Sequence, residues 1–144
     1  MPDIDYQAVF RATPGPLVLL SPEDFRVLDA NDRYLGAMER HHREVVGQCI
    51  FTIFPGHHEP SGEGPQRLRE SLESVCETGE MDWVHMLRYD HERADEPGIF
   101  EERYWNVVSA PVLGADGKPV AIIHLIEDAT PQVRAARTDH AVAG

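Results

Sequence analysis

The chain has 144 residues, and its 42% of hydrophobic side chains can build the core of one domain but are too many for a disordered protein. It carries 13 basic and 25 acidic side chains, and the net charge of −12 repels phosphate backbones and anionic lipid headgroups. No nucleic acid and no membrane are therefore expected as partners of the chain alone. Its apolar runs are too short to cross a bilayer, and residues 1–5 lack the pattern of a secretory signal, so we expect a cytoplasmic protein.

The first half of the chain predicts one β-hairpin followed by helices of unequal length. Pro22 turns the chain between two short apolar runs, and the stretch 29–32 provides side chains that cap a helix. Apolar residues recur at helical spacing ahead of Gly79, a residue typical of helix ends. The expected elements are, in order, a helix at 5–12, strands at 16–21 and 25–29, a helix at 33–38, helical turns at 41–55, a loop at 56–65 and a helix at 66–78.

The second half has a different pattern, in which apolar and polar residues alternate. The alternating stretches cover 81–89, 100–110 and 120–126, and Asp116-Gly117 between the last two is a strong signal for a hairpin turn. Strands joined by such turns form an antiparallel meander. Because small helices and one longer helix precede this meander, the sequence predicts an α+β fold with helices packed on one face of an antiparallel sheet.

The last strand ends in a segment that has the chemistry of a helix start. Thr130 is a good N-cap, and Pro131 suits the first helical position because it has no N–H to leave unpaired. Asp128 lies just upstream, where the positive end of a helix dipole favours anions. The following helix has few large aliphatic side chains and is marginal on its own, so we expect a domain over 1–130 and a linker helix or frayed tail over 131–144.

In this order the elements resemble the PAS sensory-domain family over about residues 5–130. The matching stretches are VLDANDRYLGAM, EVVGQCIFTIFP and PVLGADGKPVAIIHLIEDAT, and in the last one Asp128-Ala129-Thr130 fits the closing Asp-x-Thr of the family. The stretch FEERYWNVVSAPV is similar to a bacterial subfamily found in front of histidine kinases. The resemblance implies a PAS-like five-stranded antiparallel sheet that holds a small-molecule pocket against short helices. It also implies a homodimer and a downstream transmitter domain such as a histidine kinase.

The resemblance also indicates which face of the sheet lines the pocket. In flavin-binding relatives the residue two before the closing Asp points at the cofactor, and Ile126 has that place here. Strand alternation then puts His124 on the same face. The relay to the C-terminal helix is expected at Asp128 and Thr130. The expected ligand-binding residues are Ile53, Leu72, Val75, Val84, Met86, Trp105, Val107, His124 and Ile126, and the opposite face is expected to carry Trp83, His85, Leu87 and Tyr89.

Two of these features have an ordinary interpretation beside the functional one. A histidine in an apolar run is more often a core residue whose nitrogens find hydrogen bonds, whereas the functional interpretation of His124 is a ligand contact or a pH-sensitive switch. The segment from Asp128 to Thr130 can simply start a helix, or it can couple movements of the sheet to that helix. The residues alone leave both alternatives open, and the resemblance favours coupling.

The sequence favours neither flavin photochemistry, nor haem, nor a metal site. In light-sensing relatives a cysteine lies three residues after a glycine, whereas here Cys49 comes two after Gly47, and Ile126 replaces the polar residue that contacts the flavin. The predicted long helix has no histidine, the haem ligand of haem-binding relatives. The adjacent histidine pairs at 41–42 and 57–58 point apart and cannot converge on one ion. We therefore expect no cofactor and no metal.

Together these features predict a non-enzymatic sensory module. Its pocket would bind a small apolar or aromatic ligand, and its C-terminal helix would pass the signal on. One alternative is a ligandless dimerisation domain that pairs through the N-terminal helix and the outer face of the sheet. Another is a small α+β isomerase built around a buried acid, which is disfavoured because the acids of the three long strands lie near strand ends.

Overall fold

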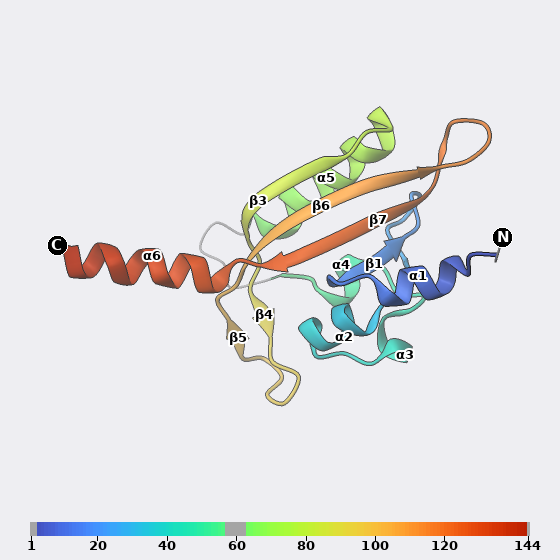
Figure 1. Cartoon of the computed structure of the whole chain (residues 1–144). Coiled ribbons are helices and arrows are strands. Elements are labelled where there is room, and N and C mark those ends of the chain that lie inside the picture. Colours follow the sequence, from blue (N-terminus) through green and yellow to red (C-terminus); the bar gives the residue numbers. More distant parts are fainter. Residues whose placement is uncertain (1–2, 57–62, 144) are drawn as a thin grey trace.

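The computed structural model describes residues 3–56 and 63–143, and its main feature is a five-stranded antiparallel sheet (Figure 1). The strand order is β2-β1-β7-β6-β3, and a separate two-stranded sheet pairs β4 with β5. Most of the predicted loop at 56–65 lies outside the described residues, and so does the pair His57-His58. The elements are α1 Tyr6–Ala12, β1 Leu17–Leu20, β2 Val27–Ala30, α2 Asp32–Met38, α3 His42–Val45, α4 Ile50–Ile53, α5 Gly64–Thr78, β3 Asp82–Arg88, β4 His91–Glu92, β5 Phe100–Glu101, β6 Tyr104–Leu113, β7 Pro119–Asp128 and α6 Thr130–Ala143.

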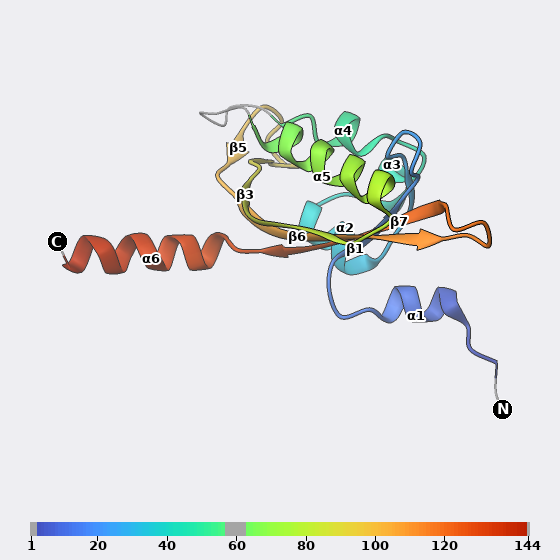
Figure 2. The same cartoon turned by 90° about the horizontal axis from the view of Figure 1, so that it is seen from above.

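The helices α3, α4 and α5 lie on one face of the large sheet, as Figure 2 shows from above, so the predicted α+β architecture is confirmed. The longest of them, α5, lies over β3 and β6 and buries Leu68, Leu72 and Val75 against the sheet. These side chains recur at helical spacing, which places them on one stripe of the helix. Gly79 then ends α5 in a left-handed conformation with φ 68°. The core therefore lies between the sheet and these helices.

Strands β6 and β7 carry on their inner face the residues that the resemblance placed there. Ser109 lies opposite His124, and Val107 lies opposite Ile126. All four are buried, whereas Ile123 on the other face of β7 is exposed. A shift of one residue would reverse this arrangement, because successive side chains of a strand point to opposite faces. The inner face of the two central strands was therefore predicted correctly.

Strand β3 contains a bulge that the alternation did not predict. Between Val84 and Leu87, two residues of β3 stand opposite the single residue Asn106 of β6. Met86 adopts the left-handed φ of 53° and donates its backbone N–H to the Asn106 side-chain oxygen at 3.0 Å. A bulge of this kind bends its strand and re-aims the side chains that follow.

The bulge makes the expectation for Met86 wrong. The extra residue shifts the alternation by one position, so Met86 lies on the outer side with 46% of its surface exposed and does not line the pocket. Leu87 and Tyr89 were expected on the outer face. Leu87 is instead buried, and both side chains turn towards the helices and line the pocket.

The stretch 100–110, predicted as one strand, contains two. Phe100 and Glu101 form β5, which pairs with β4 in a short arm beside the main sheet (Figure 1). The long strand β6 starts only at Tyr104. The stretch between the first two predicted strands of the meander contains the other strand of the arm, β4.

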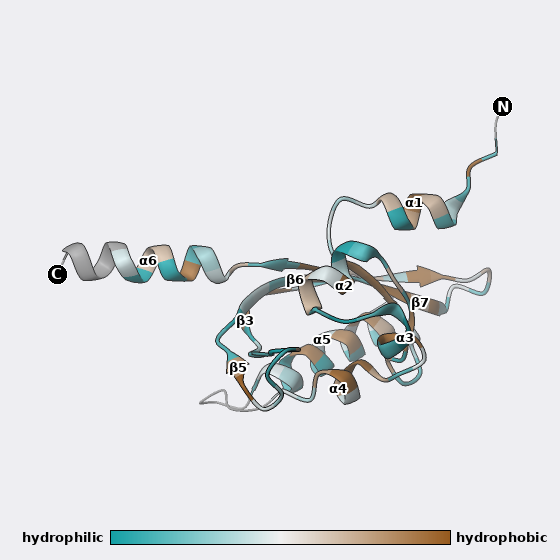
Figure 3. Cartoon of the chain, turned by 90° about the horizontal axis from the view of Figure 1, so that it is seen from below, coloured by the Kyte–Doolittle hydropathy of each residue, from teal (hydrophilic) through white to brown (hydrophobic). Residues whose placement is uncertain are grey.

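The two terminal helices stand away from the sheet (Figures 1 and 2). Asp5 caps α1 by accepting hydrogen bonds from the backbone N–H groups of Gln7 and Ala8, but no residue of α1 is buried. Figure 3 shows hydrophobic residues on this helix although it lies clear of the sheet. At the other end, α6 continues from β7 and begins at Thr130, which was expected as the N-cap, one residue before the expected start at Pro131. None of the described helices combines the length and the apolar character that a membrane span requires.

Candidate functional site

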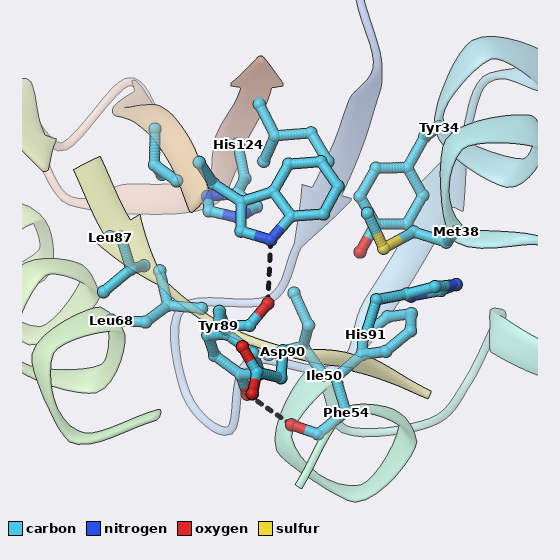
Figure 4. Close-up of a pocket in the computed structure, with 13 residues that line it drawn as sticks. Tyr34, Met38, Ile50, Phe54, Leu68, Leu87, Tyr89, Asp90, His91 and His124 are labelled. Atoms are coloured by element: carbon cyan, nitrogen blue, oxygen red, sulfur yellow. Dashed lines mark hydrogen bonds between the residues drawn. The ribbon is translucent and has the colours of Figure 1, made fainter. Parts of the chain in front are cut away.

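A cavity lies between the inner face of the sheet and the helices (Figure 4). Its free volume is about 50 Å³. On the same measure one water molecule needs about 10–15 Å³, so the cavity has room for a few waters or a very small molecule. Its wall is mostly apolar and aromatic. The lining residues are Tyr34, Met38, Ile50, Phe54, Leu68, Leu87, Tyr89, Asp90, His91, Trp105, Val107, His124 and Ile126.

The structure brings four of the expected ligand-binding residues to this cavity, namely Trp105, Val107, His124 and Ile126. The other expected residues lie elsewhere. Met86 is on the outer side of β3, as described above. The core residues Leu72, Val75 and Val84 are buried without lining the cavity, and Ile53 packs partly buried against the same core.

The sequence interpretation missed the wall that the helices and the end of β3 provide. Tyr34 and Met38 lie one turn apart on α2, and Ile50 and Phe54 come from α4 and its C-terminal end. The spacing of four residues in each pair was a usable signal, because such residues share one helix face. No comparable signal exists for 89–91, which follow the bulge of β3.

Aromatic side chains around the cavity are fixed by hydrogen bonds that Figure 4 draws as dashed lines. The indole N–H of Trp105 donates to the backbone oxygen of Tyr89 at 3.0 Å. The hydroxyl of Tyr89 donates in turn to the backbone oxygen of Phe54. Burial raises the pKa of the Tyr34 hydroxyl above its ordinary value, so this group stays neutral. The wall is therefore rigid on its aromatic side and carries no charge there.

His124 is the polar group on the sheet side of the cavity. Only 2% of its surface is exposed, and its Nδ1 lies 2.9 Å from the hydroxyl oxygen of Ser109. Burial lowers the pKa of His124 to about 4, because no nearby charge stabilises the imidazolium form. The imidazole is therefore neutral at physiological pH.

Asp90 and His91 are polar residues of the cavity lining, and each pairs with a residue outside that lining. Asp90 is buried and accepts two hydrogen bonds from the guanidinium of Arg88, at 3.1 and 3.2 Å. His91 is also buried, and its Nε2 lies 2.9 Å from a carboxylate oxygen of Glu39. Glu39 ends α2 with a left-handed φ of 54°. The contact therefore ties the arm of β4 and β5 to the end of α2.

A second polar cluster joins the sheet to α6. The backbone N–H of Tyr104 donates to Thr130 Oγ1 at 2.9 Å, and the backbone N–H of Thr130 donates to Asp128 Oδ1 at the same distance. Thr130 is 2% exposed. The two expected relay residues therefore lie together, and through Tyr104 they contact the strand that carries the cavity residue Trp105.

Arg103 also bonds to this cluster. Its guanidinium donates to Asp128 Oδ2 at 2.8 Å and also bonds Glu101. Burial alone would raise the pKa of Asp128, but the hydrogen bonds from Thr130 and the charge of Arg103 outweigh it, so the pKa lies below its ordinary value. Farther along α6, Arg137 bonds Glu102 at 2.9 Å. The first turns of α6 are therefore fastened to the sheet by charged groups.

Within 3–56 and 63–143, no three histidine, cysteine, aspartate or glutamate side chains converge as metal ligands would. Cys49 and Cys76 are both free thiols. Cys49 precedes α4 and does not line the cavity.

Comparison with known proteins identifies the domain. The sequence profile of a family described as "PAS fold" matches residues 10–134. A LOV protein from Rhodobacter sphaeroides is similar in structure, with a TM-score of 0.65 and 18% identity over 87% of this chain and 68% of that one. The PAS domain of BvgS from Bordetella pertussis gives a TM-score of 0.63 and 20% identity, over 96% of this chain and 93% of that one.

A sensory box sensor histidine kinase from Vibrio cholerae is also similar, with a TM-score of 0.57 and 14% identity over 85% of this chain and 87% of that one. At such identities the likeness of the structures shows the fold alone. The sequence profile covers the sheet, the helices around the cavity and the first turn of α6. These parts make up a single PAS domain, and the chain belongs to the PAS family.

Proposed function

We propose that the chain is a non-enzymatic sensory module that binds a small ligand in its cavity and passes the change to α6. One observation carries the proposal. Trp105 lines the cavity, and its neighbour Tyr104 donates its backbone N–H to Thr130, the residue that starts α6. A displacement of the cavity wall therefore reaches the helix start through adjacent residues of one strand. A transmitter such as a histidine kinase is the partner we propose for that helix.

The proposed ligand is smaller than a flavin ring system. The free volume of about 50 Å³ is well below the range of about 300–1,000 Å³ that pockets for drug-sized ligands usually have. No cysteine borders the cavity among the described residues, so the residues present do not fit flavin–cysteine chemistry either. A small molecule with apolar and aromatic contacts fits this wall better.

The proposed relay depends on two arrangements of the sheet end. A ligand shifts the populations of these two arrangements only if it binds one of them more tightly than the other. The candidate for the moving part is the joint between β6 and α6, where Asp128, Thr130 and Arg103 form one hydrogen-bonded cluster. This cluster is small and charged, so a shift of Tyr104 alters several bonds at once.

A second candidate function is dimerisation, with or without a ligand. Apolar side chains are exposed on α1, which buries no residue of its own, and Trp83 is exposed on the outer face of the sheet. Exposed apolar surface of this kind marks interaction sites. Two chains that bury α1 and the outer face against each other would remove both surfaces from water.

Native mass spectrometry tests ligand binding and dimerisation in one measurement. We expect the purified chain to be a dimer that retains a small molecule. Ile126→Phe adds a ring on the cavity side of β7, and Ile123→Phe adds the same ring on the outer face. Because overfilling a packed site costs about 1–3 kcal/mol, the first variant should lower ligand occupancy about tenfold and the second should not. A bare dimer, or equal effects of both variants, would contradict ligand binding.

The joint at α6 makes a separate prediction. Thr130→Val keeps the shape of the side chain but removes the acceptor of the Tyr104 N–H, at a cost of about 1–2 kcal/mol. Amide hydrogen exchange in the first turn of α6 should therefore become faster. Thr138→Val is the matched control, because its hydroxyl bonds only within α6, to the backbone oxygen of Arg134.

The relay itself is tested by a double-mutant cycle with Ile126→Phe. If the cavity and α6 are coupled through Thr130, filling the cavity should change exchange in α6 in the wild-type chain and not in Thr130→Val. Additive effects of the two substitutions would argue that the joint is only a helix start.

A further inference from the structure

The buried contact between Ser109 and His124 determines which of the two ring nitrogens of the histidine carries the proton. Ser109 lies on β6 with none of its surface exposed, directly opposite His124 on β7. Its hydroxyl has one hydrogen-bond partner among the described residues, Nδ1 of His124 at 2.9 Å. A neutral imidazole has one nitrogen that donates and one that accepts, so this contact has only two arrangements.

The two arrangements differ in what they leave unpaired. If Nδ1 carried the proton, it would donate to the Ser109 oxygen, and the buried hydroxyl proton would have no acceptor within reach. If the hydroxyl donates to Nδ1, the proton of the ring lies on Nε2, which then has no protein partner among the described residues. Each arrangement therefore leaves one donor without a protein partner. Ser109 is fully buried and does not line the cavity, whereas His124 does, so only the Nε2–H can find an acceptor in the cavity and the second arrangement is favoured.

His124 lines the cavity, and the nitrogen that Ser109 leaves without a partner is Nε2. It has no hydrogen-bond partner among the described residues, yet it is not among the polar atoms that the protein encloses completely. The open space beside His124 is the cavity, whose neighbouring wall is formed by Trp105, Val107 and Ile126. A histidine that is 2% exposed therefore presents a free N–H to an otherwise apolar part of the site.

We infer that the Nε2–H of His124 is a fixed hydrogen-bond donor for the ligand, and that the ligand is a small neutral molecule with an acceptor such as a carbonyl oxygen. This inference rests on the proposed function of the cavity. Ser109 acts as a positioning residue, because it sets the tautomer without reaching the cavity itself.

The charges around the cavity favour a neutral ligand over an anion. Asp90 lines the cavity, and Glu39 is bonded to His91, which lines it as well. Burial keeps the imidazole neutral, so His124 provides no positive charge to pair with a carboxylate. The chain as a whole has a net charge of −12. The site therefore favours a ligand that accepts a hydrogen bond and carries no charge.

The tautomer is tested without any ligand. In the chain labelled with ¹⁵N-histidine, the nitrogen shifts of His124 should identify Nε2 as protonated and Nδ1 as the acceptor. Ser109→Ala should abolish this preference. Ser71→Ala is the control, because Ser71 is a second buried serine that bonds Asp82 at 2.6 Å and is not a partner of His124. A proton found on Nδ1 in the wild-type chain would overturn the inference.

The ligand class is tested with three probes of equal size. Acetone, isobutene under a headspace of the gas, and acetate each have a trigonal centre and the same number of heavy atoms, but only acetone is a neutral acceptor. We expect acetone to shift the Nε2 signal of His124 and to bind at least about tenfold more tightly than isobutene, since one hydrogen bond to an otherwise unpaired buried donor has that effect. In Ser109→Ala the preference should shrink.

The outcomes separate this inference from the proposed function. Equal binding of acetone and isobutene would overturn the role of the donor and leave ligand binding in place. Tighter binding of acetate than of acetone would show that the site prefers an anionic ligand, and it would overturn the inference as well. If none of the probes perturbs His124, the inference is wrong, whereas a small molecule retained in native mass spectrometry would still support the proposed function.

Discussion

Replacing Asn31 by alanine is expected to destabilise the domain by about 3–5 kcal/mol, the largest effect we predict for a polar side chain. Asn31 is 1% exposed, and its side-chain oxygen accepts the backbone N–H groups of Leu17 at 3.0 Å and Tyr34 at 2.9 Å. Its amide donates to the backbone oxygen of Gly15 at 2.9 Å. The substitution leaves buried donors unpaired in both the first strand and α2.

Chemical denaturation monitored by tryptophan fluorescence measures this loss. Asp5→Ala is the matched control, because Asp5 also caps a helix by accepting two backbone N–H groups. Its helix, α1, buries no residue, so the control should leave the midpoint of global unfolding almost unchanged. Equal shifts for the two variants would mean that Asn31 is an ordinary cap and does not join two elements of the core.

The second large effect that we predict is a loss of folding stability on acidification, caused by His124. In the unfolded chain its pKa is near 6.5, and burial lowers it to about 4 in the folded chain. Between these values the unfolded chain binds a proton that the folded chain does not, so acidification through this window favours unfolding. Each unit of pKa difference is worth about 1.4 kcal/mol, and the expected loss of stability is therefore about 3 kcal/mol.

His124→Asn isolates this contribution, because the amide does not titrate and can still bond Ser109. The free energy of unfolding of the wild-type chain, measured from about pH 7 to about pH 4, should fall more steeply than that of the variant. His85→Asn, on the exposed side of β3, is the control and should retain the wild-type slope. Parallel curves for the wild-type chain and His124→Asn would show that His124 is not held as a buried neutral group.

The inner face of β6 and β7 was predictable, because burial alternates over 104–109 and 122–126 and the resemblance indicated which face lines the pocket. Trp105, Val107, His124 and Ile126 were assigned to the inner face from the sequence, and the structure places all four at the cavity. A helix start near Thr130 was also predictable, because capping residues act locally. The expected cap was not, because the Thr130 hydroxyl accepts the backbone N–H of Tyr104 from another strand.

The remainder of the cavity was not predictable in the same way. Met86 was assigned to the pocket by alternation, but a side chain of the neighbouring strand, Asn106, binds its backbone and stabilises a bulge. That contact joins residues far apart in the sequence and has no local signature. The helical wall was missed for another reason. Tyr34 and Phe54 lie on separate short helices, and nothing in the sequence indicates how these helices pack around the end of β3.

The bulge in β3 has a consequence for reading relatives of this protein. Because the strand carries one residue more than its partner between Val84 and Leu87, an aligned relative with a regular strand there should show a one-residue gap. Beyond the gap, each inward-facing residue of this chain must be matched with the residue of the relative that lies one position earlier than an ungapped alignment would give. An alignment without the gap would equate the cavity residue Leu87 with a solvent-facing position, and would then transfer ligand contacts to the wrong side chains.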